Sequence, residues 1–180
     1  MFKSLATLIL IAVPAVALAQ SAQPYAGLEG RAVKALSEQQ LADLKAGRGM
    51  GLALPAELNG YPGPSHVLEH ADALHLTAEQ RERTKALFEA MKAEAVPVGE
   101  RLIEQETQLD RLFAERQITP ASLRSATESI GATQARLREA HLKYHLAMMT
   151  VLSADQIANY QALRGYDSNA SQQHHPHRQN

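Results

Sequence analysis

Two pairs of histidines, each spaced by one helical turn, are the side chains in this sequence best suited to bind a metal. His66 and His70 form the first pair, His141 and His145 form the second, and Met149 lies one further turn along. Residues four positions apart lie on the same face of a helix, so both members of a pair can reach one ion. The spacing predicts a site for a divalent transition metal: zinc, nickel, cobalt or copper.

The second group of histidines also fits a purely structural role. His141 falls on a hydrophobic stripe between Leu137, Tyr144 and Met148, where a hydrogen-bonded interface histidine is the alternative to a metal ligand. A flexible methionine side chain often fills gaps in a core, which is the alternative for Met149. The sequence leaves both interpretations open.

Catalysis is not expected from these residues. Residues 66–70 read His-Val-Leu-Glu-His and so match the inverted zinc-protease pattern His-x-x-Glu-His. Hydrolysis would also need a third ligand, a substrate cleft and a much larger scaffold. No nucleophilic triad or paired-carboxylate arrangement is recognisable elsewhere in the sequence, so we expect a protein that is not an enzyme.

Repeated capping motifs mark the helices that must position these histidines. Residues 76–80 and 152–156 share the form Leu-Thr/Ser-x-x-Gln, and residues 36–40 are a looser third copy. In this motif the hydroxyl caps a helix N-terminus, and the glutamine three residues later reaches back to the N–H of the cap. Two helix starts are therefore predicted. The capping residues are Thr77, Gln80, Ser153 and Gln156.

Hydrophobic periodicity predicts an all-α fold built on a long antiparallel helical hairpin. Apolar residues recur at helical spacings from residue 78 to about 116, and again from about 120 to 150. A tight turn joins the two amphipathic helices, and Pro97 predicts a kink in the first. Shorter flanking helices are expected at about residues 28–45, 66–74 and 154–165.

The N-terminus and the composition indicate an exported protein. Residues 1–19 combine a lysine, an apolar run and an Ala-Leu-Ala site, which is the pattern of a signal peptide cleaved after Ala19. The apolar run is too short to span a membrane. The chain has no cysteine and a formal net charge of −1, which gives no electrostatic footprint for nucleic acid. We expect a periplasmic protein without a stable membrane span.

Beyond the signal peptide, the chain divides into three segments. Residues 20–64 form an arm with one helix and a Gly/Pro-rich connection that we expect to be flexible, and residues 65–166 form the helical domain. The polar, His-rich residues 167–180 are expected to be disordered. One hairpin has only one apolar interface to bury. The remaining apolar surface must therefore be covered by the flanking helices, a second copy of the chain or a client protein.

The chain resembles the periplasmic Spy/CpxP family and the related CnrX/ZraP-type heavy-metal resistance and sensor proteins. The resemblance covers about residues 65–166 and depends on the signal peptide, the kinked hairpin and the motifs at 76–80 and 152–156. It implies an all-α hairpin that dimerises into a curved cradle. It also implies a protein that acts without ATP, as a chaperone for unfolding envelope proteins or as a metal-responsive stress component. The arm lies outside this pattern.

The resemblance further implies a particular set of metal ligands. In CnrX-type sensors a His-x3-His pair early in the chain and a His-x3-Met pair late in it converge on a metal ion, with a carboxylate between them. Glu89 lies two residues from the expected position of that carboxylate. His66 with His70 matches the first pair, and either His141 with His145 or His145 with Met149 matches the second.

Three functions follow as hypotheses. The leading one is a non-enzymatic periplasmic chaperone or stress adaptor, and a homodimer is expected. The alternatives are a heavy-metal sensor or resistance protein that uses the His pairs, and an adaptor that docks on the periplasmic domain of a sensor kinase. For the chaperone, unfolded clients would contact an exposed apolar stripe, unless a dimer interface buries it. The stripe consists of Met91, Val98, Leu102 and Leu109.

Overall fold

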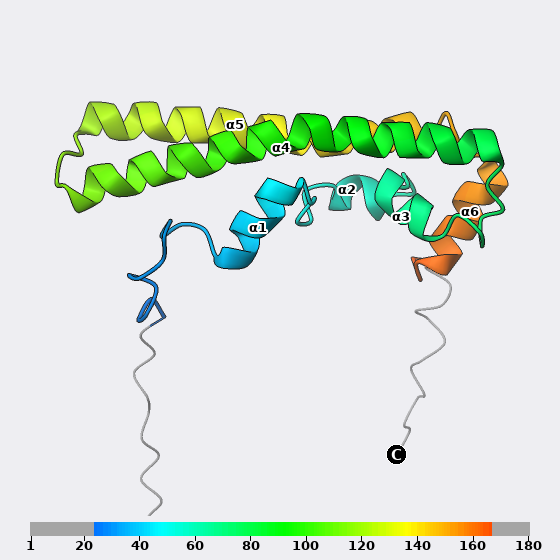
Figure 1. The fold of residues 1–180 in the computed structure, drawn as a ribbon, viewed down its shortest axis with the longest axis horizontal. Helices are drawn as coiled ribbons and strands as arrows, with labels where there is room; N and C mark the ends of the chain where they lie inside the picture. The colour runs from blue at the N-terminus through cyan, green and yellow to red at the C-terminus, as the bar shows by residue number, and fades with distance from the viewer. Residues whose placement is uncertain (1–23, 167–180) are drawn as a thin grey trace, which may run out of the picture.

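The computed structural model describes residues 24–166, and over this range the regular structure is entirely helical (Figure 1). The predicted signal peptide at 1–19 and the predicted disordered tail at 167–180 lie outside the described residues. Among the helices that the structure does describe, none combines the length and the apolar content needed to cross a membrane.

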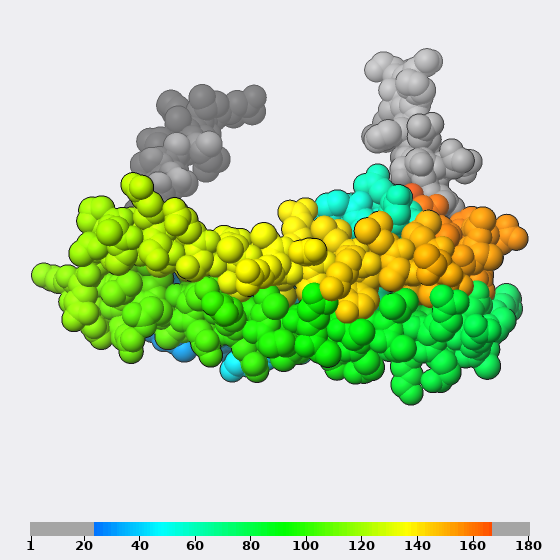
Figure 2. Space-filling view, turned by 90° about the horizontal axis from the view of Figure 1, so that it is seen from above, coloured from blue at the N-terminus to red at the C-terminus, as the bar shows by residue number. Residues whose placement is uncertain are grey.

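Two long helices form the predicted hairpin. Helix α4 spans Ala78–Ala114 and continues through Pro97, and α5 spans Pro120–Met148 and packs along it. Thr119 caps α5 and Pro120 occupies its first turn, where a missing N–H costs nothing. Figure 2 views the face that these two helices form side by side. The all-α fold class and the long hairpin are thus confirmed.

Four short helices flank the hairpin. Helix α1 spans Glu38–Ala46, later than predicted, because residues 24–36 form successive turns and the Ser37–Gln40 capping box sets the helix start. Helix α3 ends at Glu69, before the predicted residue 74, and turns follow it. The other two short helices are α2 at Leu54–Glu57 and α6 at Ala154–Leu163.

The arm, whose glycines were expected to form a flexible connection, packs along the hairpin. Helix α1 lies against α4 (Figure 1), at a point where a β-carbon on Gly99 would lie 2.7 Å from the carbonyl oxygen of Leu44. Only glycine allows the two backbones to approach this closely. Arm and hairpin share one hydrophobic core, formed by Val33, Leu36, Leu44, Ala95, Leu102, Ile130, Leu137 and Ala140.

This docking covers the stripe that was expected to contact client proteins. Met91 and Leu102 are buried, being only 7% and 5% exposed. Val98 and Leu109 are half-buried against the shared core. The flanking arm therefore covers much of the apolar surface of the hairpin.

The two Leu-Thr/Ser-x-x-Gln motifs meet at the end of the hairpin opposite the turn. Both form the predicted capping boxes. In addition, the amide groups of Gln80 and Gln156 hydrogen bond to each other in both directions, at 2.8 and 3.0 Å. Each amide also donates to the other segment, Gln80 to the carbonyl of Val151 and Gln156 to that of Leu74. The repeated motif thus ties α6 to the start of α4.

Candidate functional site

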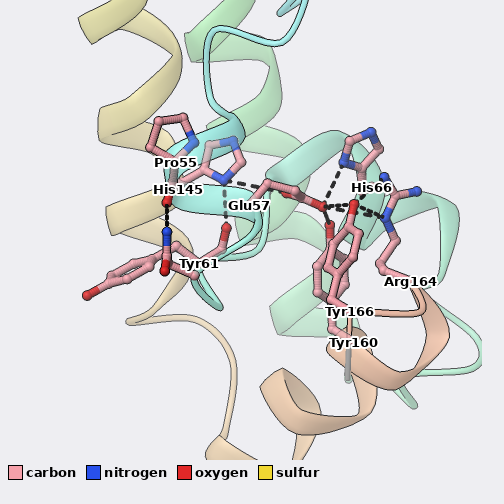
Figure 3. Close-up of polar contacts among 9 residues, drawn as sticks. Pro55, Glu57, Tyr61, His66, His145, Tyr160, Arg164 and Tyr166 are labelled. Carbon is pink, nitrogen blue, oxygen red and sulfur yellow. Dashed lines mark hydrogen bonds and ion pairs between the residues drawn. The ribbon is translucent and has the colours of Figure 1, made fainter. Parts of the chain in front are cut away.

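A buried carboxylate, Glu57 of α2, is the centre of the candidate site (Figure 3). Its side chain is 4% exposed, and a buried charge is tolerated only where partners surround it. The C-terminal part of the chain supplies three of them. Tyr160 donates a short hydrogen bond to Oε1, Tyr166 donates a second at 3.4 Å, and Nε of Arg164 lies 3.4 Å from the same oxygen.

Two histidines approach Glu57 from α3 and α5. Nδ1 of His66 lies 3.3 Å from Oε1, and Nδ1 of His145 lies 3.7 Å from Oε2. The same Nδ1 of His145 is 2.7 Å from the backbone carbonyl of Tyr61. Since a carbonyl oxygen can only accept, Nδ1 carries the proton in this contact, and the lone pair of a neutral ring is on Nε2. This is the usual arrangement of a metal-ligating histidine.

Charge at the site is distributed so that Glu57 stays ionised. Burial by itself raises its pKa, but hydrogen bonds from His66 and Tyr160 and the positive charges of His66 and His145 outweigh burial and bring the pKa to about 2. Burial, together with the hydrogen bond to Glu57, raises the pKa of Tyr160 well above its usual value. Tyr160 is therefore a permanent donor and Glu57 a permanent acceptor.

Glycine and proline in the arm make room for the histidine rings. A β-carbon on Gly63 would lie 2.8 Å from Cε1 of His145 and 3.0 Å from its Nε2. Pro55 and Pro64 each occupy the first turn of a short helix, which fixes where α2 and α3 begin. The Gly/Pro-rich composition of the arm thus serves close packing of backbone against side chains.

A cavity of about 650 Å³ lies beside Glu57. It is partly open to solvent and lies between the glycine-rich loop 47–51, α2, α3, α4, α5 and the C-terminal end of α6. Its lining includes Glu57, Met91, Lys92 and three histidines, His66, His141 and His145. The cavity therefore combines imidazole and carboxylate groups with an apolar wall.

Two buried polar atoms at this cavity have no hydrogen-bond partner within the described residues: Oε2 of Glu57 and Nε2 of His141. His141 is 2% exposed, and burial, followed by the nearby charge of His145, lowers its pKa below the usual value. His141 is thus held neutral, which is the form that binds metals. Unpartnered buried polar atoms of this kind are rare in folded proteins, and an ordered water or a ligand would satisfy them.

The structure brings together only part of the predicted ligand set. His66, His141 and His145 line the cavity, whereas His70, Glu89 and Met149 do not. The ring of His70 packs edge-on against Tyr160, Glu89 is exposed on α4, and Met149 is exposed just after α5. The carboxylate between the histidines is Glu57, in the arm, and not Glu89.

Sequence reasoning missed Glu57, although one signal pointed to it. It is the only acidic residue between Asp43 and Glu69. A lone carboxylate in an apolar, Pro- and Gly-rich segment stands out from those on the charged faces of the long helices. Its partners, however, are far along the chain, so no local pattern identifies them.

The donor groups suit a transition metal without yet enclosing one. Within residues 24–166, no three His, Asp or Glu side chains stand close enough together to hold an ion as they are. Imidazole nitrogen and carboxylate oxygen are nevertheless the ligands that zinc, nickel, cobalt and copper share. With the two unpartnered atoms at the cavity, the chemistry of the site fits such a metal.

Comparison with known proteins places the chain in a family. A search of curated proteins and a search of solved structures each found no match. The family model for heavy-metal resistance matches residues 49–159, a range that begins in the arm and includes the hairpin, every lining histidine and Glu57. The match covers more than half of the sequence, and the chain belongs to the heavy-metal resistance family.

Proposed function

We propose that this protein binds a divalent transition metal at the cavity beside Glu57 and acts as a metal-binding resistance or sensor protein of the cell envelope. The observation that carries the proposal is the meeting of His66 from α3 and His145 from α5 at one buried carboxylate, next to a cavity. Membership of the heavy-metal resistance family supports it. The envelope location follows from the predicted signal peptide and stays a prediction, as does the homodimer.

The residues of the chain have distinct parts in this proposal. Glu57, His66 and His145 would hold the metal, and His141 is a further donor that lines the cavity. When bound, the metal would supply a fixed positive charge that the anionic carboxylate balances. Tyr61 orients His145 by accepting from Nδ1, and the burial of Glu57 keeps competing water away. Binding would require the side chains to move closer together than they stand.

The chaperone hypothesis has less support. A holdase needs exposed apolar surface for its clients. The four side chains proposed for that role are buried or half-buried beneath the arm. Client binding would therefore require the arm to leave the hairpin, whereas metal binding uses the arm where it lies.

Calorimetric titration with zinc, nickel, cobalt and copper tests the metal site. The protein used carries asparagine at the three C-terminal histidines, His174, His175 and His177, so that adventitious binding there is removed. We expect Glu57→Gln, His66→Ala and His145→Ala each to weaken binding by about tenfold or more, since each removes a ligand or a group that orients one.

His75→Asn is the matched control for this titration. His75 is exposed and has a positive φ of 48°, a backbone conformation that asparagine also tolerates. Binding by this variant should equal that of the parent protein. Circular dichroism confirms that each variant is folded. Unchanged affinity in all three site variants would remove the proposed function.

A further inference from the structure

The two oxygens of Glu57 have different surroundings. Oε1 takes all the hydrogen bonds from Tyr160 and Tyr166 and lies nearest to Arg164 and His66. Oε2 has no hydrogen-bond partner within residues 24–166, and His145 is the histidine beside it. Oε1 is thus held mainly by the C-terminal part of the chain, whereas Oε2 is buried beside the α5 histidine without a hydrogen-bond partner among the described residues.

We propose that Tyr160 and Arg164 of the α6 region are positioning residues for the metal site, and that docking of α6 and binding of metal are coupled through Glu57. The proposal rests on the proposed function and names how that site is controlled. By holding Oε1, the two residues fix the rotamer of Glu57 and present Oε2 toward His145. Metal binding is then favoured when α6 is docked.

The α6 region is rigid enough to perform this task. Tyr160 is fully buried in the second hydrophobic core, with Val67, Leu74 and Met148 among its members. Arg164 is held in turn by two hydrogen bonds to the hydroxyl of Tyr166, at 3.2 and 3.0 Å. A ligand whose supporting groups are themselves fixed by packing keeps its geometry, which is what tight binding requires.

Coupling between two binding equilibria is reciprocal. If docking of α6 raises metal affinity by some factor, metal must favour the docked state of α6 by the same factor. Metal binding at the cavity would therefore be reported at the far end of the chain, in the stability of α6. The part of the molecule that senses metal and the part that responds would be joined by one carboxylate.

Tyr160→Phe tests the positioning role, because it keeps the buried ring and removes only the hydroxyl. We expect zinc affinity to fall by about tenfold, the usual effect of losing a group that orients a ligand. The absorption spectrum of the cobalt-loaded protein should change as well, since the spectrum reports ligand geometry and a purely structural defect would leave it unaltered.

Tyr144→Phe is the matched control. Tyr144 also donates to a carboxylate, Glu94, at 3.2 Å, but neither residue lines the cavity. Its affinity and its cobalt spectrum should equal those of the parent protein. Arg164→Gln should resemble Tyr160→Phe, and Arg164→Lys should recover part of the affinity.

Hydrogen exchange of residues 154–163 measures the reciprocal effect. Zinc should slow exchange there in the parent protein and much less in Tyr160→Phe. If zinc binds and Glu57→Gln weakens it, but Tyr160→Phe binds normally or zinc leaves exchange in α6 unchanged, this inference is wrong while the proposed function stands. If Glu57→Gln, His66→Ala and His145→Ala all bind zinc as the parent does, the proposed function fails and this inference fails with it.

Discussion

The two ends of the α4–α5 hairpin differ in the buried polar contacts that join their segments, although apolar side chains pack along both. Near the turn, the helices pack through apolar side chains, and Phe113 and Leu123 remain exposed. At the other end, α2, α3, α5 and α6 meet at Glu57, and Gln80 pairs with Gln156. Apolar contact brings two helices together but tolerates small displacements, whereas a buried polar network fixes which segments meet and in what register.

Among the variants that test this difference, Glu57→Ala should lower the free energy of unfolding the most. Removing one member of a buried charged network typically costs about 3–5 kcal/mol, because the remaining polar groups lose their partner. We expect that loss in the free energy of unfolding from urea denaturation, with faster hydrogen exchange in α6 and little change near the turn. Glu94→Ala, which removes an exposed carboxylate paired with Lys143, should cost less than about 1 kcal/mol. Equal costs for the two variants would contradict the contrast.

Acid should weaken the end of the hairpin that contains Glu57 and His141. The pKa of Glu57 is about 2 in the folded protein against an ordinary 4.5, so the folded state binds fewer protons. Its contribution, up to about 3 kcal/mol, is complete above pH 4.5 and is lost as the pH falls from there toward 2. The lowered pKa of His141 has the same sign, so its contribution is lost as the pH falls below 6.5.

Urea denaturation at a series of pH values checks this expectation. The free energy of unfolding should decline in two stages. Glu57→Gln should lack the lower stage, and His141→Gln should lack the upper one. A pH profile identical to that of the parent protein in both variants would show that other groups control acid stability.

The close approach of the arm gives a smaller, testable difference between two helical glycines. Gly99→Val would force a side chain against the backbone at Leu44, and overpacking of this kind costs about 1–3 kcal/mol. Gly131 lies in α5 with open space around it, so Gly131→Ala should stabilise the protein by about 0.5–1 kcal/mol. Thermal unfolding of both variants measures the two opposite shifts. A stabilised Gly99→Val would mean that the arm does not pack as described.

The paired glutamines should contribute less to stability than Glu57 does. Gln80→Ala and Gln156→Ala should each cost about 1–2 kcal/mol, since each removes a capping contact and buried hydrogen bonds between segments. Gln40 has the same place in the capping box at the exposed start of α1, so Gln40→Ala should lower the free energy of unfolding by less than either of these variants does. A double-mutant cycle on Gln80 and Gln156 should show coupling above about 0.5 kcal/mol, and purely additive costs would rule out a direct pair.

The sequence predicted those features of the fold that are encoded within a short segment of the chain. The hairpin and the caps at Thr77 and Ser153 follow from periodicity and short motifs, and all are confirmed. The docking of the arm depends on long-range contacts such as Gly99 with Leu44, which no local pattern encodes. The prediction of a flexible Gly/Pro-rich connection therefore did not include the packing of the arm along the hairpin.

The site was predictable only in part for the same reason. Helical spacing identified His66, His141 and His145 as candidate ligands, and all three line the cavity. Spacing on one helix cannot place a carboxylate that comes from another segment, which is why Glu89 was selected and Glu57 was missed. His70 follows His66 by one helical turn as the C-cap of α3, but its ring packs edge-on against Tyr160 of α6 and does not line the cavity.

The contact between Glu57 and Tyr160 joins residues 103 positions apart, and this has a consequence for how the molecule is made. A growing chain is synthesised from its N-terminus, so the carboxylate exists long before its hydroxyl partner does. Burying it alone would be unfavourable, so we expect the arm to close stably over the hairpin only when α6 is also in place. The long hairpin, whose contacts begin at its own turn, can fold earlier. Assembly of the cavity therefore needs both the arm and α6, and a chain that ends before residue 160 lacks the hydroxyl that holds Glu57.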